Sequence, residues 1–351
     1  MTIAPSRPTL EDVAREAGVS RGTVSNVFAH PERVRAEVRT KVEAAASRLG
    51  YAGPDPRGRL LRAGKFNALG FVVPGAFGLA NVILSPYGRE LIAGIGEACD
   101  AVGYSLTLID GREPQLDAAL REALVDGFVV GTIGHIAVIE PARRRRLPFA
   151  ILDVPGGPDV NSVMIDGEAG ARAVAEHLAS LGHKRIAMLS VRRTPGPPIT
   201  HAARAERLLS AGYELDRDKL AGFAAGLRAH RLSITDVPIV ETLPADPEAG
   251  RAILDAAPDA TAIFCMSDRQ AFTLLEECRN RHIAVPDDLS IVGFDGVPET
   301  ATTRPPLTTV AQPTRRKGKL AAELALGNAP PRQIVLPVEL VVRESTAPPR
   351  R

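Results

Sequence analysis

The chain has no tryptophan, and aromatic residues make up only 4% of its 351 residues. Its three cysteines, Cys99, Cys265 and Cys278, are odd in number and do not have the spacing of metal ligands, so we interpret them as buried thiols. No stretch approaches the ~20 apolar residues of a membrane span, and the N-terminus has no apolar signal region. These absences predict a cytoplasmic protein that does not enter a membrane.

Motifs for catalysis are missing as well. The sequence has no Gly-x-Ser-x-Gly elbow, no Walker loop and no pair of catalytic carboxylates. Gly94 and Gly96 could begin a dinucleotide fingerprint, but they fall inside a predicted helix, and Cys99 stands where the third glycine belongs. His177 and His183 have neither ligand spacing nor a catalytic partner. We therefore expect no enzymatic activity, no cofactor and no metal.

Residues 9–28 carry the most informative pattern that is present, two short helices around a glycine turn. Apolar residues recur at three- and four-residue spacing from Leu10 to Ala17, Gly18 ends the first helix, and Ser20 can cap the second. Two helices joined by such a turn form a helix-turn-helix, whose second helix enters the DNA major groove. An ordinary helical hairpin would show the same pattern.

A third amphipathic helix is predicted from Val38 to Leu49, and Gly50 ends it. Residues 1–65 contain 12 Lys/Arg and 7 Asp/Glu, a net charge of +5, whereas the whole chain is +2 and residues 66–351 are therefore −3. Basic charge on a small domain favours neutralisation of DNA phosphates, although a solvated basic surface gives the same bias.

Together these residues resemble a known family. Residues 9–51, followed by Pro54-Asp55-Pro56-Arg57-Gly58-Arg59-Leu60-Leu61-Arg62, are similar to the headpiece and hinge of the LacI/GalR family of bacterial transcription regulators. The segment from Leu336 to Thr346 is similar to the closing strand of that family. The resemblance implies a DNA-binding headpiece at 1–52, a hinge at 53–65 and an effector-binding and dimerisation core at 66–351.

The hinge sequence predicts a weak helix. Asp55 is a good N-cap and Pro56 suits the first helical position, but Gly58 weakens the helix by roughly 1 kcal/mol relative to alanine. The resemblance implies that paired hinge helices enter the minor groove and that Leu61 is inserted between base pairs, where apolar wedges kink DNA. A flexible Arg-rich linker is the alternative.

The resemblance also implies which residues contact DNA. Arg21 and Gly22 begin the second helix and, with Asn26, occupy base-reading positions; arginine commonly pairs with guanine and asparagine with adenine. Asn26 stands where the family commonly has arginine. Hydroxyl residues near these positions are interpreted as phosphate contacts or, equally well, as helix caps. An arginine of the hinge is a further expected DNA contact. This second group comprises Thr9, Ser20, Thr23, Ser25 and Arg57.

Residues 66–351 alternate short apolar runs with amphipathic helices, which predicts a doubly wound α/β fold with parallel sheets. About 285 residues are too many for one such sheet and fit two lobes. The predicted strands are 68–74, 105–110, 127–131, 149–153, 185–190, 262–266 and 290–294, and the predicted helices include 89–103, 115–124, 167–182 and 268–281.

For this core the resemblance implies a two-lobed, periplasmic-binding-protein-like fold. The N-lobe is expected at about 66–161 and 311–330, and the C-lobe at about 162–310 and 331–347. The three crossings between the lobes are expected near Asn161, Val310 and Pro331.

Residues of the cleft between the lobes follow from the resemblance alone. Tyr87, Lys219, Ser267 and Asp295 are the expected effector contacts, with Asp268 and Gln312 beside them. Lys219 replaces the usual arginine, and a lysine cannot make the planar fork of an arginine. The aromatic platform of the family is absent near 244–246. Each residue could instead be a strand-end turn or cap.

These features predict a homodimeric repressor that binds operator DNA in the cytoplasm, at the nucleoid, and responds to a small polar ligand, a sugar or sugar derivative. Two alternatives stay open. One is a catabolite-type global regulator controlled by a partner protein. The other is a solute-binding relative that shares the α/β core and has no DNA role.

Overall fold

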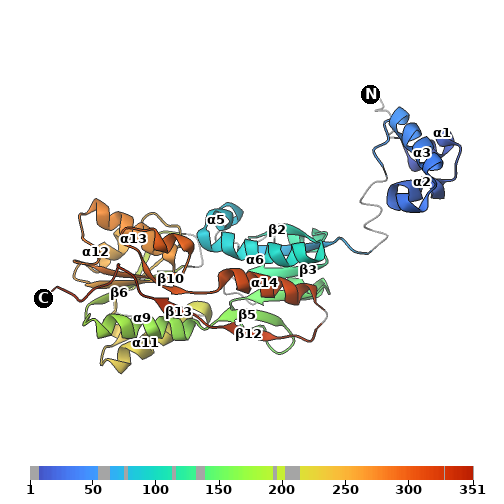
Figure 1. Cartoon of the computed structure of the whole chain (residues 1–351). Coiled ribbons are helices and arrows are strands. Elements are labelled where there is room, and N and C mark those ends of the chain that lie inside the picture. Colours follow the sequence, from blue (N-terminus) through green and yellow to red (C-terminus); the bar gives the residue numbers. More distant parts are fainter. Residues whose placement is uncertain are drawn as a thin grey trace. The chain divides into compact units, whose positions relative to one another are not determined.

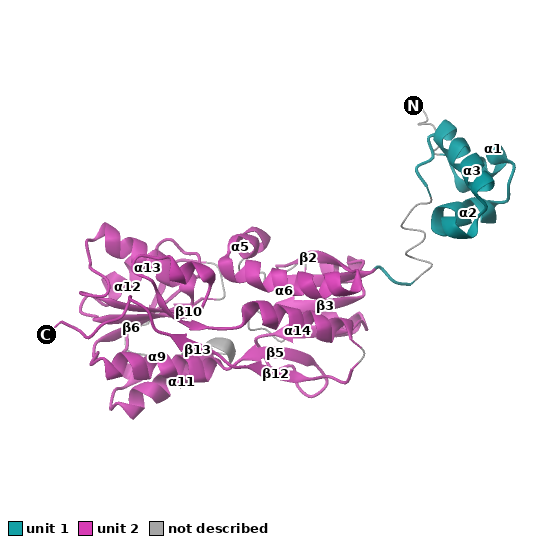
Figure 2. Ribbon diagram, in the orientation of Figure 1, with its two compact units in different colours: residues 1–66 teal, residues 67–351 magenta. Residues whose placement is uncertain are grey.

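The computed structural model describes residues 8–53, 64–74, 78–112, 116–131, 139–192, 196–201, 214–327 and 329–350. The chain divides into two compact units, Met1–Phe66 and Asn67–Arg351 (Figure 2). Each unit has its own hydrophobic core, and we describe them in turn.

The first unit packs three helices, α1 (Leu10–Ala17), α2 (Arg21–Ala29) and α3 (Ala36–Leu49), around one apolar cluster. Val13, Val24 and Val42, one from each helix, are completely buried. Gly18 and Gly50 end α1 and α3 in the left-handed conformation, with φ values of 61° and 67°, as the sequence predicts. The unit is therefore a helix-turn-helix closed by a third helix.

The second unit contains two sheets. Its elements are β1 (Ala68–Pro74), α5 (Gly78–Leu84), α6 (Pro86–Val102), β2 (Ser105–Gly111), α7 (Leu116–Glu122), β3 (Gly127–Gly131), α8 (Ile139–Arg144), β4 (Phe149–Leu152), β5 (Asn161–Ile165), α9 (Gly167–Ser180), β6 (Ile186–Val191), β7 (Ile199–His201), α11 (Glu214–Ala229), β8 (Ile239–Thr242), α12 (Ala249–Ala256), β9 (Ala262–Cys265), α13 (Asp268–Asn280), β10 (Ser290–Asp295), β11 (Thr308–Ala311), α14 (Thr314–Leu326), β12 (Gln333–Leu336) and β13 (Glu339–Val341).

Within the described residues the strand orders are β12-β5-β4-β3-β1-β2 and β13-β11-β10-β9-β6-β8-β7. The first sheet is parallel throughout, and in the second only the edge strands β7 and β13 run antiparallel to their neighbours. Helices α12 and α13 cover one face of the second sheet and α9 and α11 the other (Figure 1). The predicted doubly wound α/β fold is confirmed, and its predicted strands and helices are all present.

The crossings between the lobes fall slightly later in the chain than expected. β5 and β12 both belong to the first sheet, where Asp166 N–H donates to the Leu336 carbonyl at 2.9 Å. The chain therefore leaves this sheet after Ile165 and again after Leu336, rather than near Asn161 and Pro331. Because β5 pairs in parallel with β4, the apolar residues of β5 belong to the first lobe. The position of β5 along the chain did not indicate this. The middle crossing joins β11 to α14, close to the expected Val310.

Close packing of α6 against α14 holds the first lobe together. A Cβ atom on Gly94 would lie 1.9 Å from the Arg315 carbonyl oxygen, and one on Gly318 would lie 2.3 Å from the Leu91 carbonyl oxygen. Only glycine permits this approach of two helix backbones. The Gly94 of the rejected dinucleotide motif thus has a packing role.

We expect Gly94→Ala to destabilise the second unit by about 2 kcal/mol, because the added methyl group meets backbone that cannot move aside. Gly96→Ala is the matched control, since a Cβ there has nothing within 4 Å and alanine stabilises a helix by up to about 1 kcal/mol over glycine. Urea unfolding of the full chain measures both changes. Equal stabilities for the two variants would contradict the packing argument.

Candidate functional site

The exposed side of α2 carries the residues predicted to contact DNA bases. Arg21, Gly22 and Asn26 are exposed, on a helix whose Val24 is buried. The Arg21 side chain is 65% exposed, and its guanidinium lies 3.7 Å from the Glu11 carboxylate. A surface ion pair of this kind contributes little free energy, so the guanidinium is available to another partner.

Two of the predicted phosphate contacts, Thr9 and Ser20, also serve as helix caps. Thr9 Oγ1 donates to Asp12 Oδ2 at 2.7 Å and accepts the Asp12 amide at 3.3 Å. Ser20 Oγ accepts the Thr23 amide at 3.1 Å and lies 2.9 Å from Thr23 Oγ1, while Ser25 is half-buried. Because a phosphate oxygen only accepts hydrogen bonds, the Thr9 hydroxyl would have to leave Asp12 to contact one. Arg57 and Leu61 lie outside the described residues.

A cavity of about 460 Å³ lies between the two lobes of the second unit, within the usual size range of small-molecule sites. Five of the six predicted effector residues line it, and they come from both lobes and from the crossing between β11 and α14. They are Tyr87, Lys219, Ser267, Asp295 and Gln312. Asp268 does not line the cavity and is completely buried.

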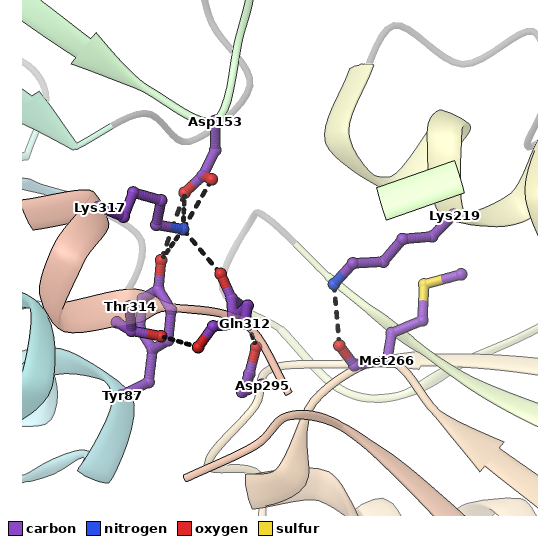
Figure 3. Close-up of polar contacts among 8 residues, drawn as sticks. All are labelled: Tyr87, Asp153, Lys219, Met266, Asp295, Gln312, Thr314 and Lys317. Carbon is purple, nitrogen blue, oxygen red and sulfur yellow. Dashed lines mark hydrogen bonds and ion pairs between the residues drawn. The ribbon is translucent and has the colours of Figure 1, made fainter. Parts of the chain in front are cut away.

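A buried ion pair that the sequence did not reveal lies against Tyr87. Lys317, on α14, donates to the two carboxylate oxygens of Asp153 at 2.8 and 3.1 Å and to the Tyr87 hydroxyl at 2.7 Å (Figure 3). Its side chain is only 1% exposed. Burial opposes the charge, but the Asp153 carboxylate outweighs it and holds the pKa of Lys317 above its ordinary value.

Each member of this pair has its own local signal, although neither signal shows that the two residues meet. Asp153 directly follows strand β4, and ligand-site residues of α/β folds lie at such carboxyl ends. Lys317 belongs to a basic run that resembles a solvated helix face, yet it is spaced three and four residues from the buried Thr314 and Ala321. Helical periodicity therefore places it on the buried side of α14.

Asp295 enters the cavity from the end of β10 in a conformation rarely adopted outside glycine, with φ at 127°. Gly296 follows with φ at 69°, and a Cβ there would lie 2.3 Å from the Ala311 Cα atom. This sharp bend aims the carboxylate at the cleft. Burial raises the pKa of Asp295 to about 6, although the ammonium groups of Lys219 and Lys317 act in the opposite direction.

Asp268 supports this bend from behind. Its carboxylate accepts hydrogen bonds from the Thr309 hydroxyl at 2.5 Å and the Val297 amide at 2.9 Å. Burial, together with the negative charge of Asp295, raises the pKa of Asp268 to about 7. Asp268 is therefore a structural neighbour of the cavity rather than part of its wall.

Lys219 and Ser267 form part of the opposite wall. Lys219 Nζ donates to the Met266 carbonyl at 3.1 Å and lies 3.8 Å from the centre of the Phe294 ring (Figure 3). Ser267 is the N-cap of α13, where its side chain accepts the Gln270 amide at 3.3 Å. Residues 243–247 also line the cavity and include no aromatic side chain, as the sequence predicts, but Phe272 does line it.

Among the residues that the structure describes, no group of three or more His, Cys, Asp or Glu side chains could hold a metal ion. No described helix is long and apolar enough to span a membrane.

Fold and site together define a class of protein in which a helix-turn-helix unit is joined to a two-lobed binding domain. Residues 9–53 match the model of bacterial regulatory proteins of the lacI family, and residues 175–346 match the periplasmic binding protein-like domain. An HTH-type transcriptional regulator of Mycobacterium tuberculosis is 36% identical over 360 residues, covering 98% of both chains. The HTH-type transcriptional regulator IpsA of Corynebacterium glutamicum is 32% identical, covering 91% of this chain and 90% of its own.

Solved structures agree with these relatives. The Lac repressor bound to ONPG in the repressed state has a TM-score of 0.72 at 26% identity, covering 97% of this chain and all of that one. The CelR–cellobiose complex has a TM-score of 0.66 at 27% identity, with the same coverage. The chain belongs to the LacI family and is a DNA-binding transcriptional regulator, so the alternative of a solute-binding protein without a DNA role is set aside.

The raised pKa of Asp268 predicts how stability depends on pH. Between about pH 4 and 7 the folded protein keeps a proton that the unfolded chain releases, so stability falls as pH rises through this window. Asp268→Asn removes this proton uptake, and an asparagine can still accept from the Val297 amide and donate to the Thr309 hydroxyl. We expect the free energy of unfolding of the variant, minus that of the parent, to be larger at pH 8 than at pH 5 by on the order of 2 kcal/mol.

Denaturant unfolding at the two pH values measures this difference. An unchanged stability gap between parent and variant at pH 5 and pH 8 would show that the buried carboxylate is ionised throughout.

Proposed function

We propose that this regulator is a repressor that binds a palindromic operator as a homodimer and releases it when a small, polyhydroxylated ligand enters the cleft. The observation that carries the proposal is the cavity of about 460 Å³, in which Asp295 and Lys219 from one lobe face Asp153 and Tyr87 from the other. A ligand that contacts both walls can favour one closure of the lobes, and only such differential binding shifts an equilibrium between two states.

The chemistry of the walls supports a ligand with hydroxyl groups. Carboxylates accept hydrogen bonds from hydroxyls, and the buried ammonium of Lys317 is already neutralised by Asp153. The structural relatives that carry cellobiose or ONPG are consistent with this class of ligand. Apolar residues such as Phe71 and Leu91 make up much of the remaining wall and can pack against the faces of a sugar ring.

The proposed dimer follows from the way a helix-turn-helix recognises DNA. One helix-turn-helix contacts a half-site, and two copies related by a twofold axis read a palindrome. We propose that the protein acts in the cytoplasm at the nucleoid, because its operator lies on the chromosome. Arg21, Gly22 and Asn26 are its proposed base-reading residues, with Thr9, Ser20, Thr23, Ser25, Arg57 and Leu61 as further proposed DNA contacts.

Binding-site selection on the full chain should return a palindrome of two half-sites. Arg21→Ala should relax base choice at one position in each half-site and weaken binding by roughly 1–3 kcal/mol, as expected for loss of a bidentate contact to guanine. Arg48→Ala is the control, because it removes the same charge from α3, where Arg48 pairs with Glu16 at 3.1 Å. An asymmetric site would contradict the dimer, and an unchanged consensus for Arg21→Ala would remove this residue from base reading.

The ligand is tested by thermal stabilisation of the full chain with ribose, glucose and cellobiose, followed by operator titration with any sugar that stabilises it. Asp295→Ala should abolish both the stabilisation and the release of operator. Asp255→Asn, which alters an exposed ion pair with Arg281, is the control and should respond like the parent. If Asp295→Ala releases operator at the same sugar concentration as the parent, the ligand binds elsewhere; if sugar tightens operator binding, it is a corepressor.

A further inference from the structure

One side chain connects the two lobes beside the crossing from β11 to α14. Gln312 Nε2 donates to Asp295 Oδ1 at 2.8 Å, and Gln312 Oε1 accepts from Lys317 Nζ at 2.9 Å (Figure 3). The backbone amide of Gln312 also donates to the Asp295 carbonyl at 3.2 Å. Asp295 ends β10 of the second sheet, whereas Lys317 lies on α14, which packs on the first. The amide of Gln312 therefore joins a carboxylate of one lobe to an ammonium group of the other.

The orientation of this amide is fixed by its neighbours. A lysine ammonium has three hydrogens and no lone pair, so only the oxygen of Gln312 can face Lys317. The NH₂ group must then face Asp295, whose carboxylate only accepts. The remaining hydrogens of Lys317 are directed to Asp153 and to Tyr87, which completes the set of donors. Lys317 thus holds Gln312 with its donor toward Asp295.

The NH₂ group of Gln312 consequently occupies a hydrogen-bonding position on Asp295 Oδ1. We propose that Gln312 is an internal substitute for the ligand donor, held by Lys317, and that it clasps the two lobes together when the cleft is empty. The part of this proposal that concerns the ligand rests on the proposed function. The clasp itself rests on the contacts of Gln312 alone.

Two consequences separate this role from that of an ordinary ligand contact. A contact residue strengthens binding, so its removal weakens the affinity for a sugar. A substitute donor competes with the sugar for Asp295, so its removal strengthens that affinity, by roughly three- to tenfold for one net hydrogen bond. Removal of the clasp also lets the lobes sample more open arrangements without any ligand.

The decisive experiment compares Gln312→Leu with Gln333→Leu, the same substitution at an exposed glutamine of β12 whose side chain donates to Gly157 within the first lobe. Spin labels are placed on cysteines introduced at Glu122 of α7 and Arg279 of α13, which are exposed and lie on different lobes. Labelled chain is mixed with excess unlabelled chain, so that only distances within one chain are measured.

Without ligand, Gln312→Leu should broaden the distance distribution and add a longer component, whereas Gln333→Leu should match the parent. Identical distributions for Gln312→Leu and the parent would overturn the clasp. If Gln312→Leu does not fold, the double variant Asp153→Asn/Lys317→Met removes the ammonium that holds Gln312 without leaving a buried unpaired charge, and it should broaden the distribution in the same way.

Calorimetry with ribose, glucose and cellobiose tests the competition. Gln312→Leu should bind at least one of these sugars more tightly than the parent, and equal or weaker binding of every sugar that the parent binds would overturn the role as a substitute donor. If neither protein binds any of the three, the proposed ligand class fails, whereas the lobe distances still decide whether Gln312 clasps the lobes.

Discussion

The second unit depends on the neutralisation of one buried ammonium group. A lysine with almost no exposure to solvent is strongly unfavourable unless a carboxylate lies beside it, and Asp153 meets this need for Lys317. That requirement fixes the end of β4 against the start of α14 and orients Tyr87 between them. Gly94 and Gly318 make the arrangement possible, because they bring α6, which carries Tyr87, within reach of α14. Packing and electrostatics thus specify the same geometry.

Buried charges are compensated differently on the two walls of the cleft. Lys317 and Asp153 neutralise each other within the first lobe, so this wall carries little net charge. On the other wall Asp295 is close to a second carboxylate, Asp268. The pKa values of both groups are raised above their ordinary range because burial disfavours the ionised forms. A polar ligand therefore meets one wall whose buried charges neutralise each other and one where the Asp295 carboxylate lies among the cationic side chains of Lys219 and Arg269.

Much of this molecule follows from local rules in the sequence. Gly18, Gly50 and the hydroxyl of Ser20 determine where the helices of the first unit begin and end, and alternating apolar runs predict both sheets. What escaped prediction depends on tertiary proximity. Nothing local shows that Lys317 and Asp153, 164 residues apart, form a pair. The assignment of β5 and β12 to the first sheet depends in the same way on strand pairing.

The caps of α1 and α2 affect how DNA specificity can evolve. The hydroxyls of Thr9 and Ser20 hold helix ends, so a substitution at either position changes the stability of the small first unit together with any contact it makes to phosphate. The side chains of Arg21 and Asn26 project from the exposed side of α2 and are absent from the apolar cluster that holds the unit together. A lineage can therefore exchange these two proposed base-reading residues without first acquiring compensating mutations in the helices that present them.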